Sequence, residues 1–246
     1  MMNYPGRNVS KDSYDFQDAI RQWTYVPFNG IATHSTDLLK LSDTALKEMV
    51  SFFERDRYSV AGWREGLGMS ADLQGKDVLD FGCGSGIEGL QCAKLGARVT
   101  AADISTLNLA LTARLFLISE IPSTNWRVIR VKESQPFFTL PENSIDLFIA
   151  SGVLHHIPYA GAIMQRVAEC VRVGGDARLL LYSDKSFHAH SDWESFVKTM
   201  DPVGNYATYY DADKVEQDFC AGGKWSLEEF TYSDFFGYAF VKLERK

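Results

Sequence analysis

A carboxylate precedes three glycines at alternate positions in the stretch DFGCGSG. The carboxylate is Asp80, and the glycines are Gly82, Gly84 and Gly86. Glycines that directly follow a strand let the chain turn tightly and let a ligand approach bare backbone. A second pattern, G-x-G-x-x-G, starts at Gly84 and ends at Gly89. The two patterns imply different ligands, so the choice between them decides the function.

The charge of Asp80 favours a cationic ligand. A carboxylate at the end of a strand would repel a pyrophosphate seated on the next helix N-terminus. It would suit S-adenosyl-L-methionine, which carries an ammonium and a sulfonium group and no phosphate. The glycine after the strand is Gly82, and from there Gly86 falls one residue too early for a dinucleotide fingerprint. We therefore expect S-adenosyl-L-methionine as the cofactor, with a nicotinamide-dependent oxidoreductase as the alternative.

A second carboxylate, Asp103, ends the next apolar run, about twenty residues after Gly82. A carboxylate at this position can accept both hydroxyls of an adenosine ribose. Nicotinamide enzymes use the same arrangement, so Asp103 does not separate the two ligand classes. Its alternative role is to cap a helix that begins near Ser105.

Short apolar runs alternate with helical patterns from Lys76 onward. The runs cover 78–81, 98–103, 126–131, 144–151 and 177–183, and the helical patterns lie near 86–95, 106–119 and 160–172. This alternation predicts parallel strands with right-handed crossovers. Two later strands, 226–233 and 236–244, are too close for a crossover helix and should be antiparallel. We predict an α/β, Rossmann-like, mostly parallel seven-stranded sheet with an antiparallel last strand and helices on both faces.

The chain divides at about residue 75. Residues 1–75 are rich in aromatic side chains, show no clear strand alternation, and contain one strong helical pattern at 43–55 that Ser42 or Asp43 could cap. We predict that they form a helical and aromatic cap or lid, in which Trp23, Tyr25 and Phe28 could contact substrate. Residues 76–246 are predicted to form the ligand-binding domain. Within it, 184–225 is an irregular insertion near the active site, with helices near 191–200 and 211–220.

The composition restricts the partners. The net charge of the 246 residues is −7, which argues against a nucleic-acid surface. No apolar run is long enough to span a bilayer, so we expect no membrane partner. The four cysteines are scattered without a C-x-x-C pair, which is typical of reduced thiols in a cytoplasmic protein and gives no zinc motif. The expected partner is a small molecule.

Four segments in order resemble the class I S-adenosylmethionine-dependent methyltransferases. They are VLDFGCGSG, AADIS, PENSIDLFIASGVLHHIP and CVRVGGDARLLLYS, and they fall within residues 76–183. The branch most similar to them contains the ubiquinone and menaquinone biosynthesis methyltransferases and many natural-product enzymes. The resemblance implies methylation of oxygen, nitrogen or carbon on a small-molecule acceptor, with S-adenosyl-L-homocysteine as the product. A protein or RNA methyltransferase, or a non-catalytic cofactor-binding protein, is the alternative.

The resemblance also implies which residues bind the cofactor. The methionine part would contact the glycine loop and the end of the fourth strand, namely Asp80, Gly82, Cys83, Gly84, Gly86, Ser151 and Gly152. Asp103 would bind the ribose and Ile104 would pack on the adenine. Glu133 and Ser134 stand where the family places a polar contact to the adenine amine, although VKESQ departs from the usual pattern.

Histidines provide the candidates for catalysis. His155 and His156 follow the fourth strand, beside the expected methyl group, and either could act as a general base or hold the loop by hydrogen bonds. His188 and His190 lie beyond the fifth strand and could contact substrate or a metal, but we expect no metal. Neither the acceptor nor the oligomeric state follows from the sequence.

Overall fold

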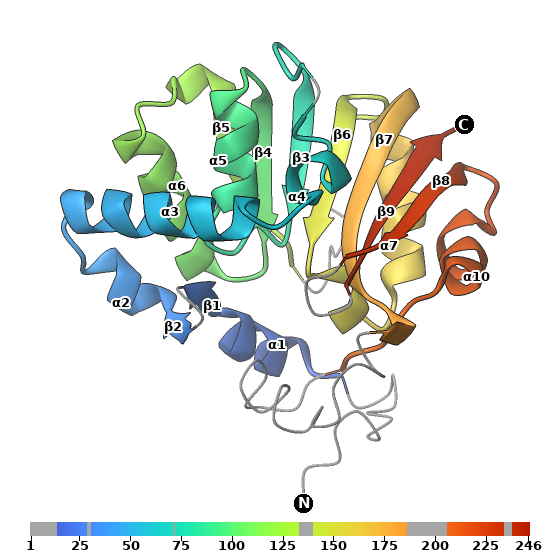
Figure 1. Cartoon of the computed structure of the whole chain (residues 1–246), viewed down its shortest axis with the longest axis horizontal. Coiled ribbons are helices and arrows are strands. Elements are labelled where there is room, and N and C mark those ends of the chain that lie inside the picture. Colours follow the sequence, from blue (N-terminus) through green and yellow to red (C-terminus); the bar gives the residue numbers. More distant parts are fainter. Residues whose placement is uncertain (1–13, 29–30, 71, 133–139, 186–205, 234–237) are drawn as a thin grey trace, which may run out of the picture.

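A computed structural model describes residues 14–28, 31–70, 72–132, 140–185, 206–233 and 238–246. Its centre is a seven-stranded sheet in the order β5-β4-β3-β6-β7-β9-β8 (Figure 1). The strands are β3 (Asp77–Phe81), β4 (Arg98–Asp103), β5 (Trp126–Arg130), β6 (Ile145–Ser151), β7 (Val171–Tyr182), β8 (Trp225–Tyr232) and β9 (Tyr238–Arg245). Strands β3 to β7 pair in parallel, whereas β9 is antiparallel to both of its neighbours. The predicted sheet is confirmed.

The strand order reverses between β3 and β6. From β3 the chain continues outward to β4 and β5, and it then returns to the other side of β3 as β6. The connections after these neighbouring strands therefore lead in opposite directions. Ligands of open parallel sheets bind at such a switch point.

Helices cover both faces of the sheet, as predicted (Figure 1). They are α3 (Asp43–Tyr58), α4 (Trp63–Gly66), α5 (Ile87–Lys94), α6 (Thr106–Ile118), α7 (Ala160–Cys170) and α10 (Ala212–Val215), with short turns η2 (Ser123–Asn125), η3 (Leu154–His156) and η4 (Glu216–Cys220). Alternate strand residues enter opposite cores. Ile149 packs in the core that contains Leu90 of α5, whereas Phe148 packs in the core that contains Met164 of α7.

The N-terminal segment contains more regular structure than its sequence predicted. It forms α1 (Phe16–Trp23), an antiparallel pair of β1 (Tyr25–Phe28) and β2 (Ile31–His34), and α2 (Ser35–Leu39). The sequence shows no clear strand alternation here, because two strands of four residues are too short to show it. These elements lie beside the carboxyl ends of the parallel strands, at the bottom of Figure 1.

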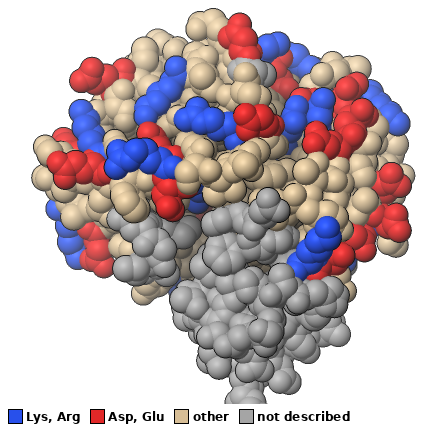
Figure 2. Space-filling view, viewed as in Figure 1, with Lys and Arg blue, Asp and Glu red and all other residues tan. Residues whose placement is uncertain are grey.

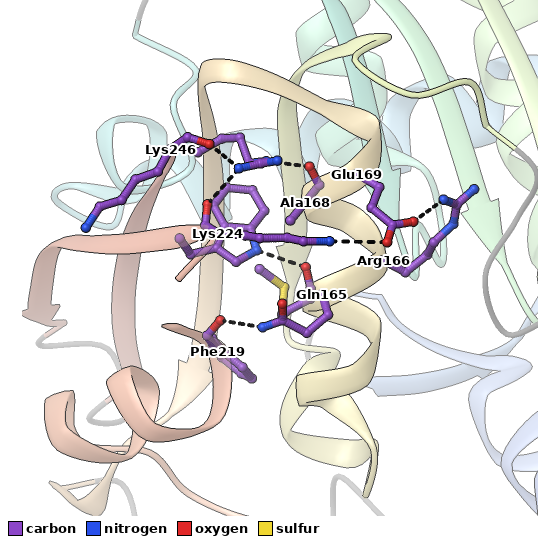
Figure 3. A network of polar contacts seen from close by, with 10 residues as sticks. Gln165, Arg166, Ala168, Glu169, Phe219, Lys224 and Lys246 are labelled. Carbon is purple, nitrogen blue, oxygen red and sulfur yellow. Dashed lines mark hydrogen bonds and ion pairs between the residues drawn. The ribbon is translucent and has the colours of Figure 1, made fainter. Parts of the chain in front are cut away.

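Polar contacts join α7 to the C-terminal strands. The Trp225 indole donates to the carbonyl of Met164 at 2.8 Å, and the Gln165 amide donates to the carbonyl of Phe219 at 3.1 Å. Lys224 donates to Glu169 at 3.2 Å, at the far end of α7 (Figure 3). The antiparallel edge of the sheet is thereby tied to the helix that covers it.

Candidate cofactor and acceptor site

The loop between β3 and α5 requires glycine at two positions. Gly82 and Gly86 have φ values of +69° and +79°, which side chains rarely adopt. A Cβ atom at Gly82 would lie 2.4 Å from Val153, and one at Gly86 would lie 2.7 Å from Thr112. The loop is therefore closely packed against Val153 on one side and Thr112 on the other.

Two other glycines are less closely packed. A Cβ atom at Gly84 would be in ordinary van der Waals contact with Val26 at 3.6 Å, and one at Gly152, after β6, would have no neighbour within 4 Å. Ser151 ends β6 beside Leu180, and the Gly152 amide donates to the carbonyl of Leu180 at 3.0 Å. Open space therefore remains beside the backbone of Gly152, at the end of β6.

Asp80 lies beneath the loop, with 2% of its surface exposed. Its Oδ2 atom accepts a hydrogen bond from the Gly89 amide, in the first turn of α5, at 3.0 Å. Burial raises the pKa of this carboxyl group to about 8, and the charge of Glu88 adds to the increase. Asp80 therefore supports the N-terminus of α5, and a nearby cation would stabilise its charged form.

Asp103, at the end of β4, bonds to the glycine loop from the side opposite Asp80. Its Oδ2 atom accepts from the Gly84 amide at 2.9 Å, and its Oδ1 atom accepts from the Ser105 amide at 2.7 Å and from Asn108 at 3.2 Å. Burial raises its pKa to about 6 in spite of these bonds. The Gly84 bond fixes the glycine loop to the end of β4, and α6 is capped by the side chain of Ser105.

A polar cluster, which we call the Asn108 cluster, joins the N-terminal segment to this turn. It consists of Thr24, Ser35, Ser105 and Asn108, all buried. Thr24 and Ser105 share a hydroxyl hydrogen bond of 2.9 Å, and Ser35 donates to Asn108 at 2.7 Å. Asn108 in turn donates to the carbonyl of Trp23 at 2.6 Å. The N-terminal segment is thus bonded to a residue that also contacts Asp103.

His155 is buried and held as a neutral ring. Its Nδ1 atom accepts a hydrogen bond from the Tyr182 amide at 3.1 Å, so the proton of the neutral ring is on Nε2. Nε2 is buried and has no hydrogen-bond partner among the described residues. Burial and the neighbouring His156 hold the pKa of His155 well below its usual range. This geometry does not favour His155 as a base, because neither ring nitrogen has an available lone pair.

His156 has the opposite arrangement. Its Nδ1 atom lies 3.2 Å from the carbonyl oxygen of Tyr206, which can only accept, so Nδ1 carries the proton. In the neutral ring Nε2 is then the basic nitrogen. The Trp23 ring lies against His156 with a centroid separation of 4.4 Å. Of the two predicted histidines, His156 has the tautomer that a general base requires.

Further aromatic rings extend the row that Trp23 and His156 begin, along the carboxyl ends of the strands. His155 stacks on Tyr182 at 3.7 Å between centroids, and Tyr182 stacks on Tyr238 at 5.3 Å. Burial raises the pKa of Tyr238 to about 12. Trp23 was predicted to contact substrate and lies at one end of this row. Tyr25, in contrast, is 46% exposed, and the side chain of Phe28 is outside the described residues.

Helix α3 supplies a cation close to the glycine loop. Arg57 pairs with Glu88, in the first turn of α5, and only 7% of the Glu88 side chain is exposed. The Arg57 guanidinium also lies over the rings of Phe53 and Trp63, at 4.1 and 5.2 Å from their centroids. Arg57 therefore pairs with a carboxylate of the protein.

The other predicted cofactor contacts have mixed outcomes. Cys83 is buried with Sγ 3.5 Å from the Thr112 hydroxyl, and burial holds its thiol pKa well above the usual range. Ile104 packs against the core on the α7 side of the sheet. Glu133, Ser134, His188 and His190 lie outside the described residues.

Two searches of the described residues bear on the expected partners. None of the helices there is long and apolar enough to cross a membrane. In the same part of the chain, no group of three or more His, Cys, Asp or Glu residues is placed to hold a metal ion. Figure 2 shows basic and acidic side chains interspersed over one face. The expectations of no metal and no nucleic acid stay predictions.

A comparison with known protein families finds a match to this region of the chain. Residues 79–177, from β3 into β7, match a family described as methyltransferase domain. This part of the chain is similar to a methyltransferase domain. The chain is 34% identical over 117 residues to a ubiquinone biosynthesis O-methyltransferase of Paracidovorax citrulli. That alignment covers 46% of this chain and 45% of the relative, so the chain spans about half the length of the curated relatives it matches.

Solved structures share the fold of the methyltransferase domain across most of the chain. The magnesium protoporphyrin IX methyltransferase of Synechocystis, solved with bound S-adenosylhomocysteine, has a TM-score of 0.61 at 16% identity. It covers 94% of this chain and 100% of its own. The [4+2]-cyclase SpnF has a TM-score of 0.57 at 13% identity and covers 74% and 80% of the two chains. At these identities the similarity shows the fold alone.

Proposed function

We propose that the protein transfers a methyl group from S-adenosyl-L-methionine to a small-molecule acceptor. The observation that carries the proposal is the bond between the Gly84 amide and Asp103, at the sheet's switch point. It joins the glycine loop to the carboxylate that would bind ribose, and open space lies beside Gly152 at the end of the neighbouring strand β6. These residues fit the cofactor: the loop backbone would contact its methionine part, and Asp80 would supply negative charge near its ammonium group.

The ribose would approach Asp103 at Oδ2. This oxygen accepts a hydrogen bond from the Gly84 amide, whereas Oδ1 accepts from the Ser105 amide and from Asn108. A carboxylate has about four positions for donors, so Oδ2 can take a ribose hydroxyl without losing the Gly84 amide. The carboxylate would therefore hold the glycine loop and bind the ribose at the same time.

The acceptor atom is an oxygen in this proposal. When bound, S-adenosyl-L-methionine supplies a methyl group activated by a sulfonium. The curated relative is named an O-methyltransferase, and a hydroxyl acceptor needs a base. His156 Nε2 would take the hydroxyl proton, while Nδ1 stays bonded to the carbonyl of Tyr206. His155 would hold the end of β7 through the Tyr182 amide.

Residues 1–75 would form a lid over residues 76–246. Trp23 lies against His156, and the Asn108 cluster bonds the same segment to the turn that contains Asp103. The lid would thus contact both ligands and exclude water from the transfer. The Trp23 ring would form part of the wall that receives the acceptor.

Calorimetry with S-adenosylhomocysteine tests cofactor binding. We expect micromolar affinity for the protein, and we expect Asp103→Ala to weaken it at least about tenfold, since one lost charged hydrogen bond is worth about 1.5–3 kcal/mol. Asp103→Asn keeps the shape of the side chain and should weaken binding in the same direction. Thermal unfolding of each variant separates lost binding from lost folding.

No binding of S-adenosylhomocysteine by the folded protein would contradict the proposal, and tighter binding of NADH would favour an oxidoreductase. A non-methyltransferase activity is the second candidate, because the [4+2]-cyclase shares this fold. Cofactor binding without methyl transfer to any of a broad panel of phenols and amines would favour that candidate.

A further inference from the structure

We propose that Arg57 is a positioning residue for the cofactor: by pairing with Glu88, it leaves Asp80 as the carboxylate that meets the ammonium group. This inference rests on the proposed function, because it concerns the amino-acid tail of S-adenosyl-L-methionine. Arg57 belongs to α3, in the N-terminal segment, which lies outside the region that matches the methyltransferase family.

Three buried carboxylates surround the glycine loop. Asp80, Glu88 and Asp103 are exposed by 2%, 5% and 5%. Asp103 accepts two amide hydrogen bonds and one from Asn108, and Asp80 accepts one amide hydrogen bond. Glu88 is the one paired with a cation, Arg57. A buried carboxylate without such compensation favours its protonated form, so the ion pair determines which group carries charge.

The position of Arg57 is fixed by packing. Its side chain is 19% exposed, and its guanidinium lies over the Phe53 ring and near the Trp63 ring. A planar guanidinium that stacks in this way loses little freedom when it forms an ion pair. Arg55, two residues earlier on the same helix, is exposed. Arg55 therefore provides a control: it is a positive charge on α3 that does not contact the glycine loop.

The charges that act on Asp80 come from several elements. Burial is the largest cause of its raised pKa; Glu88 on α5 and Asp103 on β4 raise it further, and Arg57 on α3 lowers it. The thiols of Cys83 and Cys92 also face this group, and burial holds the pKa of each well above its usual range. Loss of the arginine leaves Glu88 uncompensated beside Asp80, so Asp80 should hold its proton to a higher pH.

The pH dependence of binding tests the inference. We would titrate S-adenosylhomocysteine between pH 6 and 8.5 into the protein and into R57M, E88Q, R57M/E88Q and R55M. Affinity for the wild-type protein should rise with pH as Asp80 loses its proton. R57M should move this rise to higher pH and weaken binding about tenfold near neutral pH. E88Q should move it to lower pH, the double variant should return toward wild type, and R55M should match wild type.

A ligand without the amino-acid tail distinguishes positioning from folding. 5′-Methylthioadenosine should bind R57M within about twofold of wild type, because it has no ammonium group for Asp80. Equal weakening of both ligands at every pH, without recovery in R57M/E88Q, would overturn the inference in favour of a structural role. If R57M does not fold, E88Q alone tests the inference. A pH profile of binding by E88Q that matches wild type then overturns the inference. Absence of binding by the wild-type protein would instead overturn the proposed function.

Discussion

At the residue scale, two adjacent histidines have opposite hydrogen-bonding arrangements. His155 accepts a backbone amide at Nδ1, whereas Nδ1 of His156 faces a backbone carbonyl. The sequence predicts both as candidates but cannot distinguish them, because their partners belong to Tyr182 and Tyr206, far along the chain. The tautomer of each ring, and with it the ability to accept a proton, is set by the fold.

Nitrogen-15 NMR of histidine-labelled protein tests this difference without any acceptor. We expect the Nε2–H tautomer for His155 and the Nδ1–H tautomer for His156. His155 should stay neutral at pH values well below those at which histidines usually become protonated, because burial lowers its pKa. Signals are assigned by His155→Asn and His156→Asn, with the other histidine signals as internal references. Protonation of His155 near pH 6.5 in the folded protein would contradict this arrangement.

At the element scale, the N-terminal segment is attached to the cofactor side of the sheet by polar bonds. Ser35, at the start of α2, donates both to Asn108 at 2.7 Å and to the carbonyl of Thr24 at 3.0 Å. Because α2 and α6 are joined here, movement of the segment and the conformation of the Asp103 turn should be coupled.

Ser35→Ala tests this coupling. The variant leaves the Asn108 side chain with one partner fewer in a buried site, which typically costs about 1–3 kcal/mol. We expect faster hydrogen exchange in residues 14–40 and weaker S-adenosylhomocysteine binding. Ser59→Ala is the matched control, since its hydroxyl donates only to the carbonyl of Asp56 at an exposed helix end. Unchanged exchange in residues 14–40 would show that the segment is held by its apolar contacts instead.

Much of the arrangement of elements could be predicted from the sequence, but the N-terminal segment could not. The strands and helices from β3 to β7 follow from apolar runs and helical spacing, which a two-faced sheet requires. The β1–β2 pair was missed, although Asn29-Gly30 between its strands is a strong hairpin signal. Asn108 was not recognised as a site residue, and the pairing of Arg57 with Glu88 was not foreseen, because their partners come from distant parts of the chain.

At the scale of the whole molecule, the buried carboxylates make stability depend on pH. Burial raises the pKa of Asp80 from 3.8 to about 8 and that of Asp103 from 3.8 to about 6. At pH values between the ordinary and the raised pKa of each group, the folded protein binds more protons than the unfolded chain. The free energy of unfolding should therefore fall as pH rises through this range.

Asp80→Asn should remove most of this dependence. Asparagine keeps an oxygen that can accept the Gly89 amide, and it has no charge to bury. We expect its melting temperature to exceed that of wild type by a margin that grows from pH 5 to pH 8, since each pH unit with one extra proton corresponds to about 1.4 kcal/mol. S-adenosylhomocysteine binding should weaken in the same variant. A difference in melting temperature that is constant with pH would contradict the assigned cause.

The position of β9 also sets an order for assembly during synthesis. β8 precedes β9 in the chain, yet β9 lies between β7 and β8 in the sheet. When β8 leaves the ribosome, β9 has not yet been synthesised. The backbone of β8 therefore has no partner strand in the sheet until β9 follows. During that interval the growing chain exposes the edge of β7 and the unpaired β8 together. The contacts of Trp225 with α7 give β8 an anchor that does not depend on β9.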